Sequence, residues 1–191
     1  MLRRLLPLTL VCTVLFAAGA RATTVIPPTF DQLVAGARLI FVGEVVSQRA
    51  IWQPTPRGRS IVTIVTFRVD EVWKGSLGNQ TQLEFLGGTI GEDRMEVVGM
   101  PEFTVGQRDV LFVSDEVRTI SPLVGFMHGR LRIVHDPAGV DRVAAYDGRS
   151  LASTAQIGAA RSPSLLSITP MRLSELESAV RARVTAAGRA R

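Results

Sequence analysis

The chain has 191 residues, with 22 Lys and Arg, 17 Asp and Glu and a formal net charge of +5. This length is enough for one domain with a substantial core plus a tail. The basic balance does not indicate a nucleic-acid partner, because three of the arginines lie in the first 22 residues and the remainder carries a net charge of only +2. That remainder also contains no cysteine, so no disulfide is expected to hold the fold.

The first 22 residues have the pattern of a secretory signal peptide. A short basic start at Arg3-Arg4 precedes an apolar run over residues 5–18, and a group of small residues ends at Ala22. The run of about 14 apolar residues is shorter than the roughly 20 that cross a bilayer, so we expect cleavage between Ala22 and Thr23 and not a retained anchor. The sequence therefore predicts an exported protein, periplasmic or extracellular, with no integral membrane span after processing.

A short helix is expected near the start of the mature chain. Pro27-Pro28 disfavours a helix at that point, whereas Thr29 and Gln32 have the spacing of a capping box. Apolar residues then recur at helical spacing, which predicts a helix over about residues 30–36. We expect its apolar face to lie across the β-rich domain that follows.

From residue 39 the apolar period changes to two, which is the period of β-strands. A first strand is predicted over residues 39–47, with Gly43 marking a bend or bulge. Residues 51–60 contain two prolines and a glycine and are predicted to form a loop. A longer strand begins at Ile61, and its alternation breaks at Asp70-Glu71, which predicts a β-bulge.

Shorter strands follow between turn residues, at 81–86, 95–98, 109–114, 129–134 and 140–146. Residues 135–139 have the composition of a hairpin turn between the last two. Seven short strands with almost no helix between them predict a mainly β domain over residues 23–147. We expect a small closed or nearly closed antiparallel barrel, similar to an OB fold.

The composition changes again in the C-terminal part of the chain. Residues 148–169 are rich in Ser, Ala, Gly and Pro with little periodicity, which is typical of a flexible linker. Thr169 as N-cap and Pro170 in the first turn then predict an amphipathic helix over residues 170–188. We expect its apolar stripe to dock on the chain's own barrel or on a second copy, with attachment to a membrane surface as the alternative.

Two motifs resemble the netrin-like domains, which include the tissue inhibitors of metalloproteinases. They are Leu39-Ile40-Phe41-Val42-Gly43-Glu44-Val45 and the segment from Val65 to Gly75, which ends in Val72-Trp73-Lys74-Gly75. The resemblance covers about 35 residues and implies an OB-type five-stranded barrel. The same pattern is similar to a set of uncharacterised secreted bacterial proteins. In the inhibitor family a disulfide-bonded cysteine at the mature N-terminus chelates the protease zinc, and here that position is Thr23.

The sequence offers few candidates for catalysis or metal binding. His128 and His135 are the only histidines, and a metal site can be drawn from them with neighbouring acids, although a surface or turn position is the simpler interpretation of each. No Gly-x-Ser-x-Gly motif is present, and the only cysteine lies in the leader, so nucleophilic catalysis has no support. The aromatic and basic pattern of nucleic-acid-binding barrels is missing, and no cofactor is predicted.

These observations favour a non-enzymatic module that binds a protein or an envelope component. Its candidate contact surfaces are the loops at residues 51–60 and 117–127. One alternative is a small secreted metalloprotein or hydrolase that uses His128 and His135. Another is a protease inhibitor that acts through Thr23, which rests on fold analogy.

Overall fold

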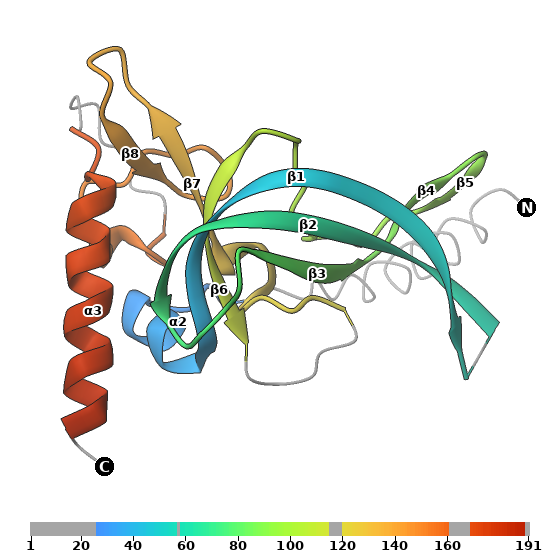
Figure 1. The fold of residues 1–191 in the computed structure, drawn as a ribbon, viewed down its shortest axis with the longest axis horizontal. Helices are drawn as coiled ribbons and strands as arrows, with labels where there is room; N and C mark the ends of the chain where they lie inside the picture. The colour runs from blue at the N-terminus through green and yellow to red at the C-terminus, as the bar shows by residue number, and fades with distance from the viewer. Residues whose placement is uncertain (1–25, 57, 115–119, 161–168, 190–191) are drawn as a thin grey trace, which may run out of the picture.

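A computed structural model describes residues 26–56, 58–114, 120–160 and 169–189. Its main feature is a six-stranded antiparallel sheet of order β3-β2-β1-β6-β7-β8, accompanied by a two-stranded sheet of β4 and β5 (Figure 1). The strands are β1 Ala37–Thr55, β2 Gly58–Lys74, β3 Gln80–Leu86, β4 Gly88–Ile90, β5 Asp93–Met95, β6 Arg108–Ser114, β7 Arg130–His135 and β8 Asp141–Ala144. The helices are α2 Phe30–Gly36 and α3 Leu173–Arg189, with 3-10 turns η2 Phe126–Gly129 and η3 Thr154–Gln156. The predicted mainly β fold is confirmed.

The six-stranded sheet is open, so the expectation of a closed barrel is wrong. β3 and β8 form its two edges and do not pair with each other. The chain itself covers the β8 edge, because isolated bridges join Ala144 to Ser150 and Arg142 to Arg172. An edge whose hydrogen-bonding groups are already paired cannot accept β3, and a barrel closes only when its edge strands meet.

The segment expected to be a loop at residues 51–60 is instead the far half of a long β-hairpin. β1 and β2 stay paired from Ile40 opposite Lys74 out to Thr55 opposite Gly58. Pro54 is tolerated because the pairing of β1 with β6 ends at Glu44, so the outer half of β1 is an edge strand. The Arg59 guanidinium carbon lies 4.1 Å from the Trp52 ring centroid, which adds a cation–π contact across the hairpin. This projecting half, residues 48–64, is called the arm, and it extends away from α3 (Figure 1).

The predicted bulge in β2 is present. Val42 lies opposite Glu71 and Gly43 opposite Val69, which leaves Asp70 as the extra residue. A side chain at position 43 would crowd its neighbours, since a Cβ there would lie 2.8 Å from the Phe41 ring. Glycine at this position therefore permits the close approach of β1 and β2 where the strands bend.

Both helices pack on one face of the sheet, which is called the helix face. α2 has the predicted bounds and the predicted capping box, in which the Gln32 amide donates to Thr29 Oγ1 at 3.3 Å and the Thr29 amide donates to Gln32 Oε1 at 2.9 Å. The core of this face joins both helices to strand residues, including Leu33, Ile40, Val42, Phe112, Leu131, Val143, Leu176 and Val180. Docking of the C-terminal helix on the chain's own sheet is thereby confirmed.

The C-terminal helix begins at Leu173, later than the predicted residue 170. Arg142 holds the preceding residues extended beside β8, because its Nη1 donates to the Pro170 carbonyl at 3.0 Å and its backbone bridges to Arg172. Arg172 then donates its own amide to the Glu175 carboxylate at 2.7 Å, which satisfies one of the free amides at the helix start. The contacts with Arg142 thus explain why the helix begins later than its local sequence predicts.

Part of the expected linker is folded onto the domain. Leu151 is fully buried and Ile157 is 6% exposed, and both belong to the core of the helix face. The Leu151 carbonyl also accepts a hydrogen bond from the Met171 amide at 2.6 Å. Composition did not predict this burial, because small and polar residues surround both side chains in the sequence. The expectation of a flexible linker is therefore wrong for residues 148–160.

The shorter strands β3, β6, β7 and β8 lie close to their predicted positions. The hairpin turn between β7 and β8 is also confirmed, with the Asp136 carboxylate accepting the amides of Ala138 and Val140 at 2.9 and 2.8 Å. The strand predicted at residues 95–98 is displaced toward the N-terminus. β5 covers Asp93–Met95 and pairs with β4, whereas residues 96–107 form a loop.

Candidate binding surface

The second face of the sheet is called the loop face. It is covered by residues 96–107, which are called the crossing loop. Phe103 of the crossing loop is buried against this face, with its ring centroid 5.4 Å from that of Phe67 and 4.9 Å from that of Phe85. Phe41 adds a further edge-on contact with Phe67 at 6.0 Å. An aromatic cluster therefore fixes the crossing loop to β1, β2 and β3.

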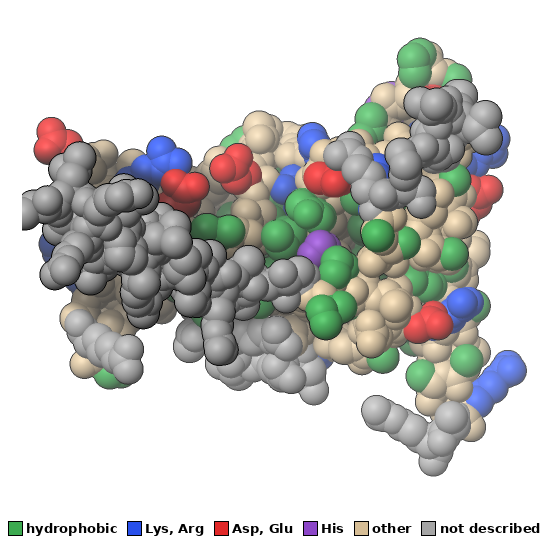
Figure 2. Space-filling view, turned by 180° about the vertical axis from the view of Figure 1, so that it is seen from behind, with side chains coloured by type: hydrophobic (Ala, Val, Ile, Leu, Met, Phe, Trp, Pro, Cys, Tyr) green, Lys and Arg blue, Asp and Glu red, His purple; other side chains and the backbone are tan. Residues whose placement is uncertain are grey.

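Two pockets on the loop face lie along the crossing loop. The larger, about 560 Å³, has Phe85 and Phe103 among its apolar lining and Arg94 and Glu96 among its charged residues. The smaller, about 370 Å³, is lined by Gly99, Met100, Pro101, Glu102, Thr104, Gln107, Met127, Arg130, Arg132 and Tyr146. It is called the arginine pocket. From behind, apolar side chains gather in the middle of the molecule around a histidine, with acidic and basic side chains beside them (Figure 2).

A buried ion pair lies beside the arginine pocket. Arg130 Nε lies 3.0 Å from Asp109 Oδ1, and the two side chains are 4% and 0% exposed. Neither carboxylate oxygen of Asp109 has a well-aligned hydrogen bond from the described part of the chain. Burial raises the pKa of Asp109, whereas the nearby charge of Arg130 acts in the opposite direction.

Arg130 also connects the sheet to the crossing loop. Its Nη1 donates to the Glu102 carbonyl, and its guanidinium carbon lies 4.5 Å from the Phe103 ring centroid. A cation over an aromatic face and a charge-assisted hydrogen bond both favour one fixed orientation of the guanidinium. The crossing loop is therefore held by aromatic packing and by a buried cation.

Arg132 is the second arginine of this pocket and lies opposite Asp109 in the strand register. Its side chain is partly buried and its Nε is inaccessible to solvent, yet that Nε has no hydrogen-bond acceptor among the described residues. Its charge lowers the pKa of Asp109, but Asp109 forms its ion pair with Arg130. The pocket thus contains an arginine that the fold itself leaves without a partner in the described ranges.

The two predicted histidines have different surroundings. His128 lies in η2 and lines a third pocket, of about 230 Å³, where its ring packs edge-on against Tyr146 with centroids 5.0 Å apart. Burial lowers the pKa of His128, and the charge of Asp147 acts in the opposite direction. His135 ends β7, and its Nδ1 lies 2.8 Å from Asp141 Oδ1. The two rings therefore have no contact partner in common.

Within the ranges that the structure describes, no three His, Cys, Asp or Glu side chains are placed to hold a metal ion. The expected cleavage point, Ala22 and Thr23, lies outside the described residues. Of the predicted contact loop at 117–127, residues 117–119 also lie outside them, and Leu123 is fully buried in the aromatic core. The described part of that loop, residues 120–127, therefore contributes to packing.

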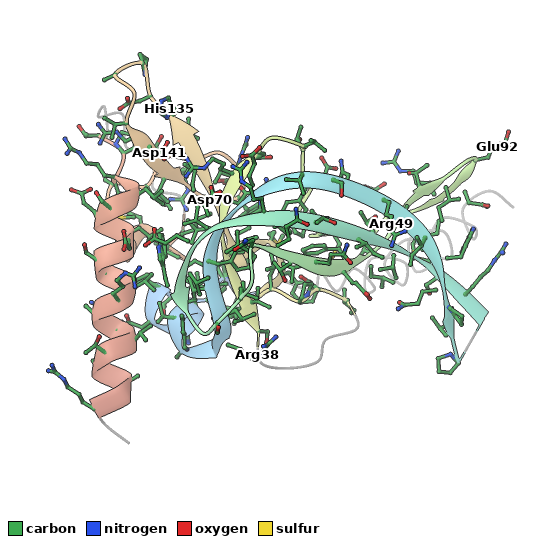
Figure 3. The ribbon with its side chains drawn as sticks, viewed as in Figure 1. Arg38, Arg49, Asp70, Glu92, His135 and Asp141 are labelled. Atoms are coloured by element: carbon green, nitrogen blue, oxygen red, sulfur yellow. The ribbon has the colours of Figure 1, made fainter. Side chains whose placement is uncertain are left out.

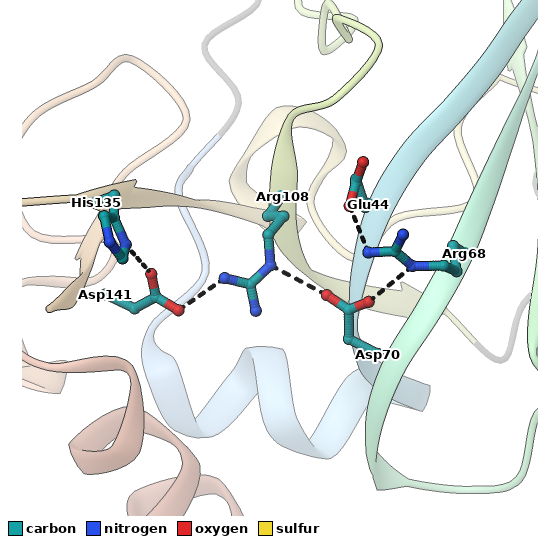
Figure 4. Close-up of polar contacts among 6 residues, drawn as sticks. All are labelled: Glu44, Arg68, Asp70, Arg108, His135 and Asp141. Carbon is teal, nitrogen blue, oxygen red and sulfur yellow. Dashed lines mark hydrogen bonds and ion pairs between the residues drawn. The ribbon is translucent and has the colours of Figure 1, made fainter. Parts of the chain in front are cut away.

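His135 belongs to a row of alternating charges on the helix face (Figure 4). Arg108 pairs with Asp141 at 2.7 Å and with Asp70 at 3.0 Å, and Arg68 pairs with Asp70 at 3.3 Å and with Glu44 at 2.5 Å. The labelled His135, Asp141 and Asp70 lie on the α3 side of the molecule, whereas Arg49 and Glu92 lie toward its other end (Figure 3). Partial burial alone would raise the pKa of Asp141, but the hydrogen bonds and charges of His135 and Arg108 together lower it.

This row has a structural explanation. Glu44 shares a face with Ile40 and Val42, and Arg108 shares a face with Val110 and Phe112, so the row continues the helix face beyond its apolar core. Alternating charges keep that exposed surface polar and pair with one another, and exposed pairs of this kind contribute little to stability. The arginine pocket, with buried charges and an unpartnered donor, is the stronger candidate site.

No protein-family model, no curated protein and no solved structure gives a significant match to this chain. The site is therefore supported by its own geometry. None of the helices in the described ranges is both long and apolar enough to cross a bilayer.

Sequence reasoning missed Asp109, Arg130 and Arg132. Asp109 directly precedes the apolar run Val110–Val113 of β6, which is a weak signal for a buried charge that needs a partner. Its partners lie on a strand more than twenty positions away, and only the pairing of β6 with β7 brings them together. Residue spacing alone could not have supplied that register.

Proposed function

We propose that this chain is an exported, non-enzymatic module that binds a protein or an envelope component on its loop face. One observation carries the proposal: Val98 is 96% exposed at the wall of the 560 Å³ pocket, whose lining combines aromatic and charged side chains. Apolar surface with a polar rim is typical of binding sites. Val105, on the same loop, is a second exposed apolar side chain, at 57%.

The polar groups of this pocket favour binding over catalysis. Arg94 and Glu96 pair with each other at 3.3 Å while remaining exposed, as rim residues of an interface do. The hydroxyl of Thr63 donates to the Gly87 carbonyl at 2.7 Å, so its proton is used to hold the fold together. Export itself rests on the signal-peptide pattern of residues 1–22.

The proposal is tested by capture from an envelope extract with purified tagged protein. The variant Val98→Asp places a charge on the apolar surface and should lose the captured component. Val134→Asp is the matched control, because Val134 is 46% exposed on β7 and does not line either pocket of the crossing loop. Equal capture by both variants and the unaltered protein would contradict binding at the loop face.

We also propose that the fold is a relative of the OB-type netrin-like barrel with an opened sheet. The long bent β1, the glycine at its bend and the end of β2 at Trp73 and Lys74 support this relation. Trp73 is buried, and Lys74 Nζ donates to the Val34 carbonyl at 2.8 Å, which joins the end of β2 to α2. An experimental structure in which β1, β2 and β3 do not form one curved sheet would contradict it.

Protease inhibition through Thr23 is a second candidate, and one observation favours it. Pro28, five residues after Thr23, is clamped between two glycines. A Cβ at Gly158 would collide with the Pro28 carbonyl, and one at Gly125 would lie 2.7 Å from the Pro28 ring. This clamp supplies an anchor close to the mature N-terminus without a disulfide. Adding one residue before Thr23 should abolish inhibition of a metalloprotease panel, and unchanged inhibition constants would exclude chelation by Thr23.

A further inference from the structure

We propose that the arginine pocket binds the C-terminal carboxylate of a peptide chain whose last side chain is apolar. This inference deepens the proposed function and rests on it for its biological role. Its charge recognition comes from Arg130, Arg132 and Asp109.

The charges of Arg130, Asp109 and the half-buried Arg132 do not cancel. Arg130 and Arg132 contribute two positive charges, and Asp109 contributes one negative charge that is committed to Arg130. Glu102 also lines the pocket, but its side chain is exposed at the rim, where water and salt screen its charge. One positive charge is left over, and a monoanionic group would balance it.

The donors of Arg132 are available to such a group. A guanidinium carries five N–H donors in a planar fork that matches the two oxygens of a carboxylate. No nitrogen of Arg132 donates to any residue in the part of the chain that the structure describes. A carboxylate in the pocket would meet the two terminal Nη groups, because Nε is inaccessible to solvent, and hydrogen bonds from a charged donor to a carboxylate are roughly twice as strong as neutral ones. Gln107, Thr104 and Tyr146, whose side chains carry further donors, also line this pocket.

The remaining walls of the pocket indicate what carries the carboxylate. Met100, Pro101 and Met127 provide apolar lining beside the two arginines. Methionine side chains adapt to apolar groups of different shape. A peptide C-terminus with an apolar last residue presents both features together, a carboxylate and an apolar side chain on one carbon atom.

The test uses N-acetylleucine as the probe and N-acetylleucinamide as its neutral isostere. Binding is measured by calorimetry and by the ¹⁵N signal of the arginine Nε–H groups, at constant ionic strength set with chloride. We expect saturable binding of N-acetylleucine with a shift of the Arg132 signal. The amide should bind at least about tenfold more weakly, because a charge-assisted hydrogen bond is roughly twice as strong as a neutral one.

Two variants and one control locate the site. Arg132→Met should weaken N-acetylleucine binding at least about tenfold by removing the fork. Gln107→Glu is nearly isosteric and should do the same, because it supplies a carboxylate from the protein itself. Gln48→Glu adds the same charge at the 560 Å³ pocket and should leave the affinity unchanged. The near-isosteric variant keeps the test valid even where Arg132→Met fails to fold.

Three outcomes would overturn the inference: equal affinities for N-acetylleucine and its amide, unchanged affinity in Gln107→Glu, or tighter binding of glucuronate or inorganic phosphate than of N-acetylleucine. Failure of the proposed function is seen separately. If Val98→Asp captures its partner normally while N-acetylleucine binds as expected, the carboxylate site stands and the interface at Val98 falls. If capture depends on Val98 but N-acetylleucine does not bind, the interface at Val98 stands and the carboxylate site is wrong.

Discussion

Arg130 on β7 and Asp109 on β6 form an ion pair 3.0 Å long inside a mainly apolar domain. Moving two charges out of water is costly, and their attraction repays that cost only in part. Such a pair is therefore expected to define the position of the crossing loop more than to stabilise the domain, because Arg130 also contacts Glu102 and Phe103 of that loop.

A double-mutant cycle tests this relationship. Asp109→Leu should lower the free energy of unfolding by about 3–5 kcal/mol, because it leaves Arg130 buried without its counter-ion. Arg130→Met is the second single variant, and the double variant of Asp109→Leu with Arg130→Met should lose clearly less than the sum of the two single losses, since neither member of the pair is then left buried without the other. Urea unfolding followed by circular dichroism measures each value. Additive losses in the double variant would mean that the two side chains do not interact.

His128 should make the domain less stable in mild acid. Burial lowers the pKa of His128 in the folded protein below its ordinary value of 6.5. Below pH 6.5 the unfolded chain therefore binds a proton that the folded chain does not, so the free energy of unfolding falls as the pH decreases from that value. Stability from this residue is fully present above pH 6.5 and declines until the folded pKa is reached.

The variant His128→Phe checks this sign. Phenylalanine keeps an aromatic ring against Tyr146 but cannot titrate, so part of the slope of stability between pH 6.5 and 5 should disappear. His135→Asn is the matched control and should retain the slope that His128 produces. Melting temperatures across this pH range provide the measurement. A steeper slope in His128→Phe would show that the sign is wrong.

Much of the fold could be predicted from local patterns. The capping box of Thr29 and Gln32, the bulge at Asp70 and the Asp136 turn each depend on residues within a few positions of one another, and each is found as expected. Such features are encoded by backbone preferences and short-range hydrogen bonds, so a single sequence is sufficient to find them.

The errors have a common physical origin in distant contacts. Pro54 indicated a loop, but the outer half of β1 is an edge strand and accepts it. Composition indicated a linker near Leu151, but a core formed by the helices and β8 buries that side chain. The prediction of a closed sheet was wrong because residues far along the chain cover the β8 edge. The arginine pocket was missed for the same reason, since it depends on the register of β6 and β7.

Leu176 should anchor α3 to the sheet. Its side chain is fully buried in the core of the helix face. Leu176→Ala should lower the free energy of unfolding by about 2–5 kcal/mol, through lost burial and the cavity left behind. Ser178→Ala, on the exposed side of the same helix, should change it by less than about 0.5 kcal/mol. Similar losses in both variants, measured by urea unfolding, would contradict docking of α3 through Leu176.

Gly158 should be indispensable for seating the N-terminal segment. Its φ is +75°, and an added Cβ would collide with the Pro28 carbonyl. Gly91 has a similar φ of +59° but open space around it, so Gly91→Ala measures the backbone cost alone, about 1–2 kcal/mol. Gly158→Ala should cost about 1–3 kcal/mol more than this control, because overpacking is added to the same strain. Urea unfolding of the two variants measures the difference. Equal losses would show that Pro28 moves aside freely, and the clamp near the mature N-terminus would then offer no rigidity to a chelating Thr23.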